Sequence, residues 1–183
     1  SDLTGVAISI GPGSFTGLRI GLATAKMLSY ALSIPVVAVS SLEAMAYHYP
    51  VPGVYVASVL DAQKSNAYFA LYEWNGKGFD EKKQTCVMDF EEVVKYCSTL
   101  DKPVVFVGDI AQKKAEIIAQ YENVSLGLPH LCMPRASNVA MAAKARFENE
   151  DYDNIMDLEP VYIRRSEAEV LWEKRHGEKL TDL

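Results

Sequence analysis

The sequence predicts an α/β fold, in which strands and helices alternate along the chain. Two short apolar runs, Val6 to Ile10 and Val36 to Val39, flank a long segment with helical periodicity. A strand, a helix and a second strand within about 35 residues are typical of a right-handed crossover between parallel strands. Further strand-like and helix-like segments follow after residue 50 and continue the alternation.

The composition is that of a globular chain with an acidic balance. Its 183 residues carry a formal net charge of −6, with 49% hydrophobic and 23% charged residues. No apolar run reaches the roughly 18 residues that a membrane span needs, so we expect no contact with a membrane. The acidic balance predicts weak direct binding to nucleic acid. Three cysteines without C-x-x-C spacing argue against disulfides or a cysteine zinc site and favour a cytoplasmic location.

The motif "HYPVPG" at residues 48–53 punctuates the chain, and we place a lobe boundary near residue 50. Residues 1–50 then form one lobe and residues 51–183 a second. Within the first, Ser40 and Glu43 have the spacing of a capping box, which predicts a short helix that runs through Tyr47.

The second lobe reads as an antiparallel meander followed by helices and a buried strand. Strand-like runs at Val54 to Leu60 and Ala67 to Trp74 precede Asn75-Gly76, which predicts a tight turn into a third strand. The elements expected after it are a helix at 89–100, a strand at 104–107, a helix at 110–121, a helix at 137–148 capped by Ser137 or Asn138, an extended segment at 161–163, and a charged helix or tail after Ser166.

The turn "GPGSFTG" joins the first strand to the long helix. Its glycines do not have the spacing of a dinucleotide fingerprint, and no Lys-Ser or Lys-Thr follows as a P-loop requires. Two interpretations remain open: the glycines permit a sharp reversal with close packing, or the exposed amides of the turn bind an anion. The residues of the possible anion-binding turn are Gly11, Gly13, Ser14 and Thr16.

The long helix carries two apolar stripes rather than one. One contains Ile20, Ala23, Met27 and Ala31, and the other contains Gly17, Leu18, Gly21, Leu22, Ala25, Leu28 and Leu32. Since a surface helix buries one stripe against its sheet, the second requires another cover, either further chain or a partner. The small residues of the second stripe permit close approach of another helix. We therefore predict a docking surface made of Gly17, Leu18, Gly21, Leu22, Ala25, Ser29 and Leu32.

Four stretches together resemble the bacterial TsaB family, whose members are accessory subunits in the synthesis of threonylcarbamoyladenosine on tRNA. They are "GPGSFTGLRIGLATAK", "IPVVAVSSLEAMA", "LDAQKSNAYFALY" and "EPVYIRRSEAE". The first two are the more specific, and the resemblance runs from about Val6 to Glu169. Gln63, Lys64 and Ile110 depart from the usual family pattern.

The resemblance implies an actin-like ATPase fold of two ribonuclease-H-like lobes, with the first lobe truncated at its N-terminus. It implies docking on the catalytic paralogue TsaD, a homodimer when the chain is alone, contact with the ATPase subunit TsaE, and tRNA binding only through the complex. It also implies that ATP and Mg belong to the full complex, with no cofactor bound by this chain itself.

Candidate catalytic residues are few. His48, His130 and His176 are far apart in the sequence and have no second ligand at metal-binding spacing, so we expect no metal site. A glycoprotease-like peptidase would need Ser14, Ser40 or Ser41 to meet His48, although no G-x-S-x-G elbow is present. A nucleotide-binding enzyme of the actin fold would use the glycine turn and Asp61, which otherwise reads as a turn residue.

The prediction from sequence is therefore a non-catalytic scaffold subunit that supports threonylcarbamoyl transfer, with the nucleotide-binding enzyme and the peptidase as alternatives. Asp109 is expected to cap a helix. A basic cluster of Arg164, Arg165, Lys174 and Arg175 is either a solvated face or a contact for tRNA or TsaE.

Overall fold

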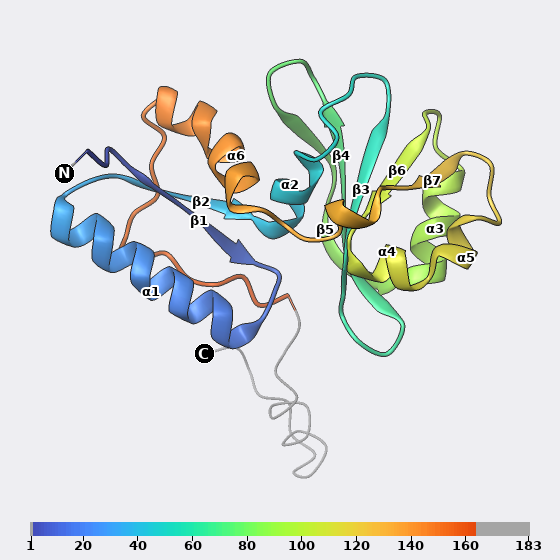
Figure 1. Cartoon of the computed structure of the whole chain (residues 1–183), viewed down its shortest axis with the longest axis horizontal. Helices are drawn as coiled ribbons and strands as arrows, with labels where there is room; N and C mark the ends of the chain where they lie inside the picture. The colour runs from blue at the N-terminus through green and yellow to red at the C-terminus, as the bar shows by residue number, and fades with distance from the viewer. Residues whose placement is uncertain (1, 164–183) are drawn as a thin grey trace, which may run out of the picture.

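The computed structural model describes residues 2–163, which form two β-sheets joined through a short helix (Figure 1). The first sheet pairs β1 (Val6–Gly11) with β2 (Val36–Ser40) in parallel, and α1 (Phe15–Leu32) makes the crossover. The predicted strand–helix–strand unit is thus confirmed. The predicted charged helix or tail after Ser166, and the basic cluster within it, lie outside the described residues.

The two faces of the first sheet are covered by different helices. Because side chains alternate along a strand, Val36 and Ala38 face one way and Val37 and Val39 the other. Val36 packs with Leu22 of α1, whereas Val37 and Val39 pack with α6 (Ala136–Glu148). Two strands therefore support two small apolar layers.

The second sheet has five strands in the order β5-β4-β3-β6-β7. The strands β3 (Tyr55–Asp61), β4 (Asn66–Trp74) and β5 (Phe79–Asp89) form the predicted antiparallel meander. The strands β6 (Val104–Val107) and β7 (Val124–Leu126) add to β3 in parallel. The sequence analysis missed β7, which is only three residues long.

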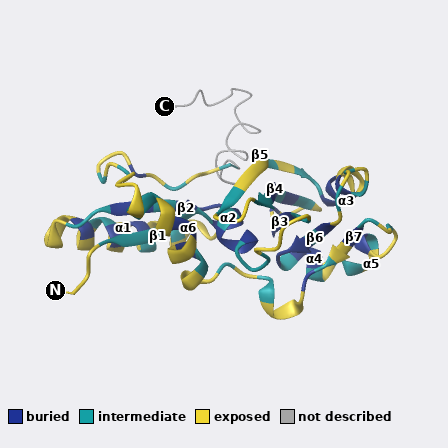
Figure 2. Ribbon diagram, turned by 90° about the horizontal axis from the view of Figure 1, so that it is seen from above, coloured by how far each residue is buried: buried dark blue, intermediate teal, exposed yellow. Residues whose placement is uncertain are grey.

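The main core lies between this sheet and the helices α3 (Phe90–Ser98), α4 (Asp109–Lys113) and α5 (Ala115–Ile118). The opposite face of the sheet packs on α2 (Ser41–Ala46), whose Leu42, Met45 and Ala46 are fully buried (Figure 2). Ser40 caps α2 by accepting a hydrogen bond from the Leu42 amide. The helix that the capping box predicted is thus the joint between the two sheets.

Two details of the helix predictions are wrong. The single helix expected at 110–121 is broken into α4 and α5 at Lys114, whose φ of −121° and ψ of 36° are not helical. The bend lets Ile110 and Ile118 both reach the core of the five-stranded sheet. The cap of α6 is also misassigned: the helix begins at Ala136 after Arg135, which makes no side-chain cap bond. Ser137 and Asn138 lie inside the first turn.

After the five-stranded sheet the chain returns to the first sheet. It passes through the short 3-10 helix η1 (Pro129–Leu131) into α6, which packs on β1, β2 and α2. Residues 153–161 then hydrogen-bond to both strands of the first sheet. The lobe boundary near residue 50 stays a prediction, and the packing places residues 136–161 with the elements that precede it.

Candidate functional site

The face of α1 that lies against the sheet is the stripe that the sequence analysis assigned to docking. Leu22, Ala25 and Ser29 are only 5%, 3% and 6% exposed. Leu22 packs with Val36 and Leu158, and the Ser29 hydroxyl donates a hydrogen bond to the Ile34 carbonyl. These three residues are therefore closed to a partner, which corrects the prediction that they make the docking contacts.

Small side chains explain why this stripe turned inward. A Cβ atom added at Gly21 would lie 3.3 Å from Cδ1 of Ile8, so glycine lets α1 approach β1 closely. The same small residues had suggested close approach of a partner helix. In the structure, these small residues instead allow close packing of α1 on β1 of the same chain. Of the remaining residues of the predicted surface, Leu18 and Gly21 are half-buried, and Gly17 and Leu32 are exposed at its rim.

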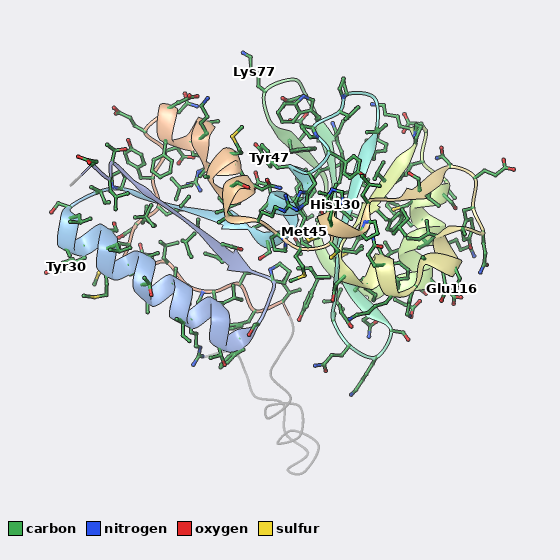
Figure 3. The ribbon with its side chains drawn as sticks, viewed as in Figure 1. Tyr30, Met45, Tyr47, Lys77, Glu116 and His130 are labelled. Atoms are coloured by element: carbon green, nitrogen blue, oxygen red, sulfur yellow. The ribbon has the colours of Figure 1, made fainter. Side chains whose placement is uncertain are left out.

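The other apolar stripe of α1 is open to solvent. Ile20 and Met27 are 63% and 64% exposed. Tyr30, which lies beside this stripe near the C-terminal end of the helix and is labelled in Figure 3, is 75% exposed. We call this surface the outer face of α1; its residues are Ile20, Ala23, Thr24, Met27, Leu28 and Ala31, all exposed. Ile20, Ala23, Met27 and Ala31 are the stripe that the sequence analysis identified without assigning docking to it, whereas Leu28 was grouped with the other stripe. Docking was assigned to that other stripe because of its small residues, since periodicity alone does not say which stripe meets the sheet.

The glycine turn is closely packed. Gly11 has a φ of +114°, and a Cβ atom there would lie 3.1 Å from both Cδ1 of Leu18 and the carbonyl oxygen of Val161. The Ser14 hydroxyl caps α1 by accepting a hydrogen bond from the Gly17 amide at 3.3 Å. Packing thus accounts for the glycine at position 11, and helix capping accounts for the serine at position 14. Anion binding by Gly11, Gly13, Ser14 and Thr16 stays a prediction.

Asp61 and Asp109 meet at the carboxyl ends of the neighbouring strands β3 and β6. The Lys113 ammonium group donates to both carboxylates, at 2.9 Å to Asp61 and 3.2 Å to Asp109. The hydrogen bond from Lys113 holds the pKa of Asp61 below its ordinary value. Asp109 is the first residue of α4 rather than its N-cap, which is Gly108. Both carboxylates that could face a ligand are thus paired with the Lys113 ammonium group of the same chain.

The serines considered for a peptidase have structural partners. Ser14 and Ser40 cap α1 and α2, and the Ser41 hydroxyl is hydrogen-bonded to that of Ser9 at 2.7 Å. The His48 ring instead contacts the Met133 carbonyl at 3.0 Å and the Asn138 amide at 3.1 Å. In the described part of the chain, the His48 ring is thus hydrogen-bonded to Met133 and Asn138 rather than to one of these serines.

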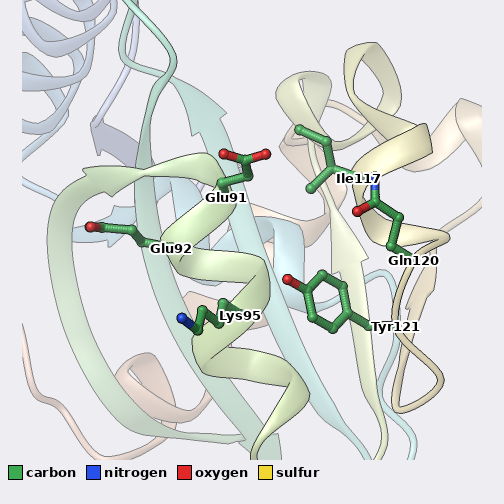
Figure 4. A pocket seen from close by; sticks show the side chains of 6 residues that line it. All are labelled: Glu91, Glu92, Lys95, Ile117, Gln120 and Tyr121. Carbon is green, nitrogen blue, oxygen red and sulfur yellow. The ribbon is translucent and has the colours of Figure 1, made fainter.

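Three other kinds of functional site are conceivable in the described chain: a ligand pocket, a metal site and a membrane-spanning helix. Between α3 and α5 lies a shallow groove of about 210 Å³, lined by Glu91, Glu92, Lys95, Ile117, Gln120 and Tyr121 (Figure 4). Residues 2–163 contain no group of three or more His, Cys, Asp or Glu side chains placed to hold a metal ion. No helix in this range combines the length and hydropathy of a membrane span.

The fold is that of solved YeaZ structures. YeaZ from Pseudomonas aeruginosa superposes with a TM-score of 0.72 at 24% identity, over 87% of this chain and 73% of that one. A second structure, described as an uncharacterized protein with similarity to peptidase YEAZ from Pseudomonas aeruginosa, gives a TM-score of 0.73 at 25% identity, over 88% and 74%. The expected actin-like fold is thus confirmed.

Comparison with known sequences identifies the family. Residues 1–172 match the family model described as TsaD, tRNA N6-adenosine threonylcarbamoyltransferase. The tRNA threonylcarbamoyladenosine biosynthesis protein TsaB of Bacillus subtilis is 31% identical over 93% of this chain and 74% of its own length. The protein of the same name from Escherichia coli is 28% identical over 98% and 77%. With its fold, its glycine turn and these relatives, the chain belongs to the TsaB family.

Proposed function

We propose that this chain is a non-catalytic subunit in the biosynthesis of threonylcarbamoyladenosine on tRNA, and that it binds a catalytic TsaD-type partner through the outer face of α1. The observation that carries the proposal is the exposure of Ile20 and Met27, at 63% and 64%, in the middle of one helix face. The names of the TsaB relatives supply the pathway.

The outer face has the chemistry of a protein interface. It contains aliphatic and methionine side chains and the Thr24 hydroxyl, which donates to the Ile20 carbonyl of the same helix. It carries no charge, since Arg19 and Lys26, the only charged residues of α1, lie to one side. Covering one large apolar side chain contributes roughly 1.5–3 kcal/mol. Three such side chains stand on this face: Ile20, and two turns further along the helix, Met27 and Leu28. A groove or helix face of matching apolar character is therefore the partner surface that fits.

The contacts of the candidate catalytic and nucleotide-site residues support a scaffold role. Ser14 and Ser40 are helix caps, and Asp61 is paired with Lys113. We further propose that the chain self-associates through the same face when no partner is present, and that it contacts TsaE. In this proposal it meets tRNA only within the complex, other subunits bind ATP and Mg, and the complex is cytoplasmic.

The experiment is an interaction measurement with a purified TsaD-type partner. We expect Ile20→Glu and Met27→Glu each to weaken binding at least about tenfold, because burying a carboxylate without a counter-charge is costly. Met141→Glu is the matched control, since Met141 is 54% exposed on α6, away from this face. Unchanged binding by both α1 variants would refute the interface. Leu22→Glu is unsuitable as a probe because Leu22 is buried and the variant should unfold the first sheet.

A nucleotide-dependent enzyme is the second candidate, favoured by the match of residues 1–172 to a transferase family model. Calorimetry of the chain with ATP and Mg separates the two: micromolar binding supports the enzyme, and its absence supports the scaffold. A peptidase would be revealed by casein cleavage that Ser14→Ala removes.

A further inference from the structure

Residues 153–163 form a segment that ties the end of the described chain to the first sheet; we call it the clamp segment. At its start, the Asp153 amide donates to the Val36 carbonyl of β2 at 3.0 Å. Near its end, the Val161 amide donates to the Ile10 carbonyl of β1 at 2.8 Å. The clamp segment is thus attached to both strands beneath α1.

Between these two attachments, and directly after the second, the clamp segment contacts one flank of α1. The Arg19 side chain donates to the Tyr162 hydroxyl at 2.8 Å, and its guanidinium lies 3.9 Å from the centre of the Phe15 ring. Leu158 is buried against Leu22. The contacted residues 19, 22 and 26 are spaced three and four apart, so they form one line along the helix.

The third contact involves Lys26, whose ammonium group donates to the Met156 carbonyl at 3.5 Å. Both charged residues of α1, Arg19 and Lys26, are therefore held by the clamp segment. Close packing of Gly21 and Ala25 already favours the inward stripe, but nonpolar contacts are not directional, so they restrict small rotations of α1 only weakly. Directed hydrogen bonds from the charged flank distinguish the orientations, since rotation breaks them.

We propose that the clamp segment sets the rotation of α1 about its axis and so selects the stripe that is presented to the partner. Tyr162 and Leu158 are then positioning residues for docking, although neither belongs to the outer face. The inference rests on the proposed function, because the selected stripe matters only if a partner binds it. It adds that a surface formed by residues 20–31 depends on a segment more than a hundred residues later in the sequence.

The test measures helix rotation and partner binding separately, in the full chain. A thiol introduced by Ala23→Cys lies on the outer face, and one introduced by Ala25→Cys lies on the inner side, where Ala25 is 3% exposed. Peptide mapping after reaction with a maleimide distinguishes the introduced thiol from the three native cysteines and gives its labelling rate. With the native clamp segment, position 23 should react at least about tenfold faster than position 25.

Clamp variants should reduce that ratio. Tyr162→Phe removes only the hydroxyl that receives the Arg19 hydrogen bond, and Leu158→Ala removes the apolar anchor. We expect each to bring the two labelling rates at least about threefold closer together and to weaken binding of the TsaD-type partner by a similar factor, while the circular dichroism spectrum is retained. A merely structural role would instead let position 25 react through transient unfolding, so its labelling rate would rise steeply with low concentrations of urea. Labelling that reflects a rotated but folded helix would not show this dependence.

The outcomes separate the two proposals. If Ile20→Glu abolishes binding and both clamp variants keep the native labelling ratio, the clamp proposal is wrong and the docking surface stands. If the ratio changes in the clamp variants while Ile20→Glu and Met27→Glu bind normally, the clamp sets helix rotation but the docking surface is wrong. The present inference requires both the changed ratio and the weakened binding.

Discussion

Asn138 and His48 form a hydrogen bond of defined direction between α6 and the end of α2. The amide nitrogen of Asn138 lies 3.1 Å from Nδ1 of His48 and also donates to the Ala44 carbonyl at 3.0 Å. An amide nitrogen only donates, so Nδ1 must accept. The remaining ring nitrogen, Nε2, lies 3.0 Å from the Met133 carbonyl and must carry the proton.

The first prediction is therefore that neutral His48 is the Nε2–H tautomer. Two-bond and three-bond nitrogen–proton correlations in the imidazole ring measure this directly at pH 8. Asn138→Ala should lower the free energy of unfolding by about 1–2 kcal/mol, because it leaves the buried Ala44 carbonyl without this donor. A predominant Nδ1–H tautomer would show that the Asn138 side chain is oriented the other way.

Acid should weaken the fold through Glu73. Hydrogen bonds from Lys102 and then Lys82, the latter with a 3.0 Å contact, hold the pKa of Glu73 below its ordinary value. A carboxyl whose pKa is lower in the folded than in the unfolded chain adds stability above its unfolded pKa, and this stability is lost as the pH falls through its folded pKa. Urea unfolding from pH 7 to pH 3 should thus show a shallower acid loss in Glu73→Gln than in the native chain. Equal slopes would contradict the assignment.

Glu43 should have the opposite effect. Burial of the Glu43 carboxyl is the main cause that raises its pKa, and repulsion from Glu81 raises it further. The positive charge of Arg146 offsets this only in part. The folded state therefore disfavours the charged form of Glu43. The stability that goes with the protonated carboxyl is present at low pH and is lost as the pH rises through the raised pKa. We expect Glu43→Gln to be more stable than the native chain at pH 7, and the difference to shrink on acidification. Chemical unfolding at pH 7 and pH 4 measures both.

The Ser58 hydroxyl is buried in β3 without a hydrogen-bond partner among the described residues. An unpaired buried hydroxyl is costly, so Ser58→Ala should raise the free energy of unfolding by about 1 kcal/mol. Ser58→Val serves as a control, because its larger side chain must overpack the fully buried site. Destabilisation by Ser58→Ala would mean that the hydroxyl has a partner, such as an ordered water.

Among the glycines of residues 2–163, Gly108 leaves the least room for a side chain. Its φ is +133°, and a Cβ atom would lie 1.7 Å from the carbonyl oxygen of Val59, so the backbone itself would have to move. Gly108→Ala should cost at least about 3 kcal/mol or prevent folding. Gly53 is the matched control: its φ is also positive, but nothing lies within 4 Å of the added atom. Gly53→Ala should cost only about 1 kcal/mol, and similar losses for both variants would contradict the argument.

The sequence by itself determined the order of most elements. Apolar runs bounded by glycine, proline and asparagine predicted the crossover, the meander and the turn at Asn75-Gly76, because these signals depend on residues close in the chain. The two apolar stripes of α1 were also visible. The break at Lys114 and the short strand β7 were not, since Ile110 and Ile118 follow a helical spacing until both are required in one core.

Tertiary structure decided which stripe of α1 is buried and which is exposed. The sequence favoured Leu22, Ala25 and Ser29 for docking because small residues permit close approach, and it could not tell a partner's helix from the chain's own β1. The structure brings Gly21 against Ile8 and joins Arg19 to Tyr162 and Lys26 to Met156, residues that are 143 and 130 positions apart. Periodicity records which residues share a face, whereas the surroundings of that face come from distant parts of the chain.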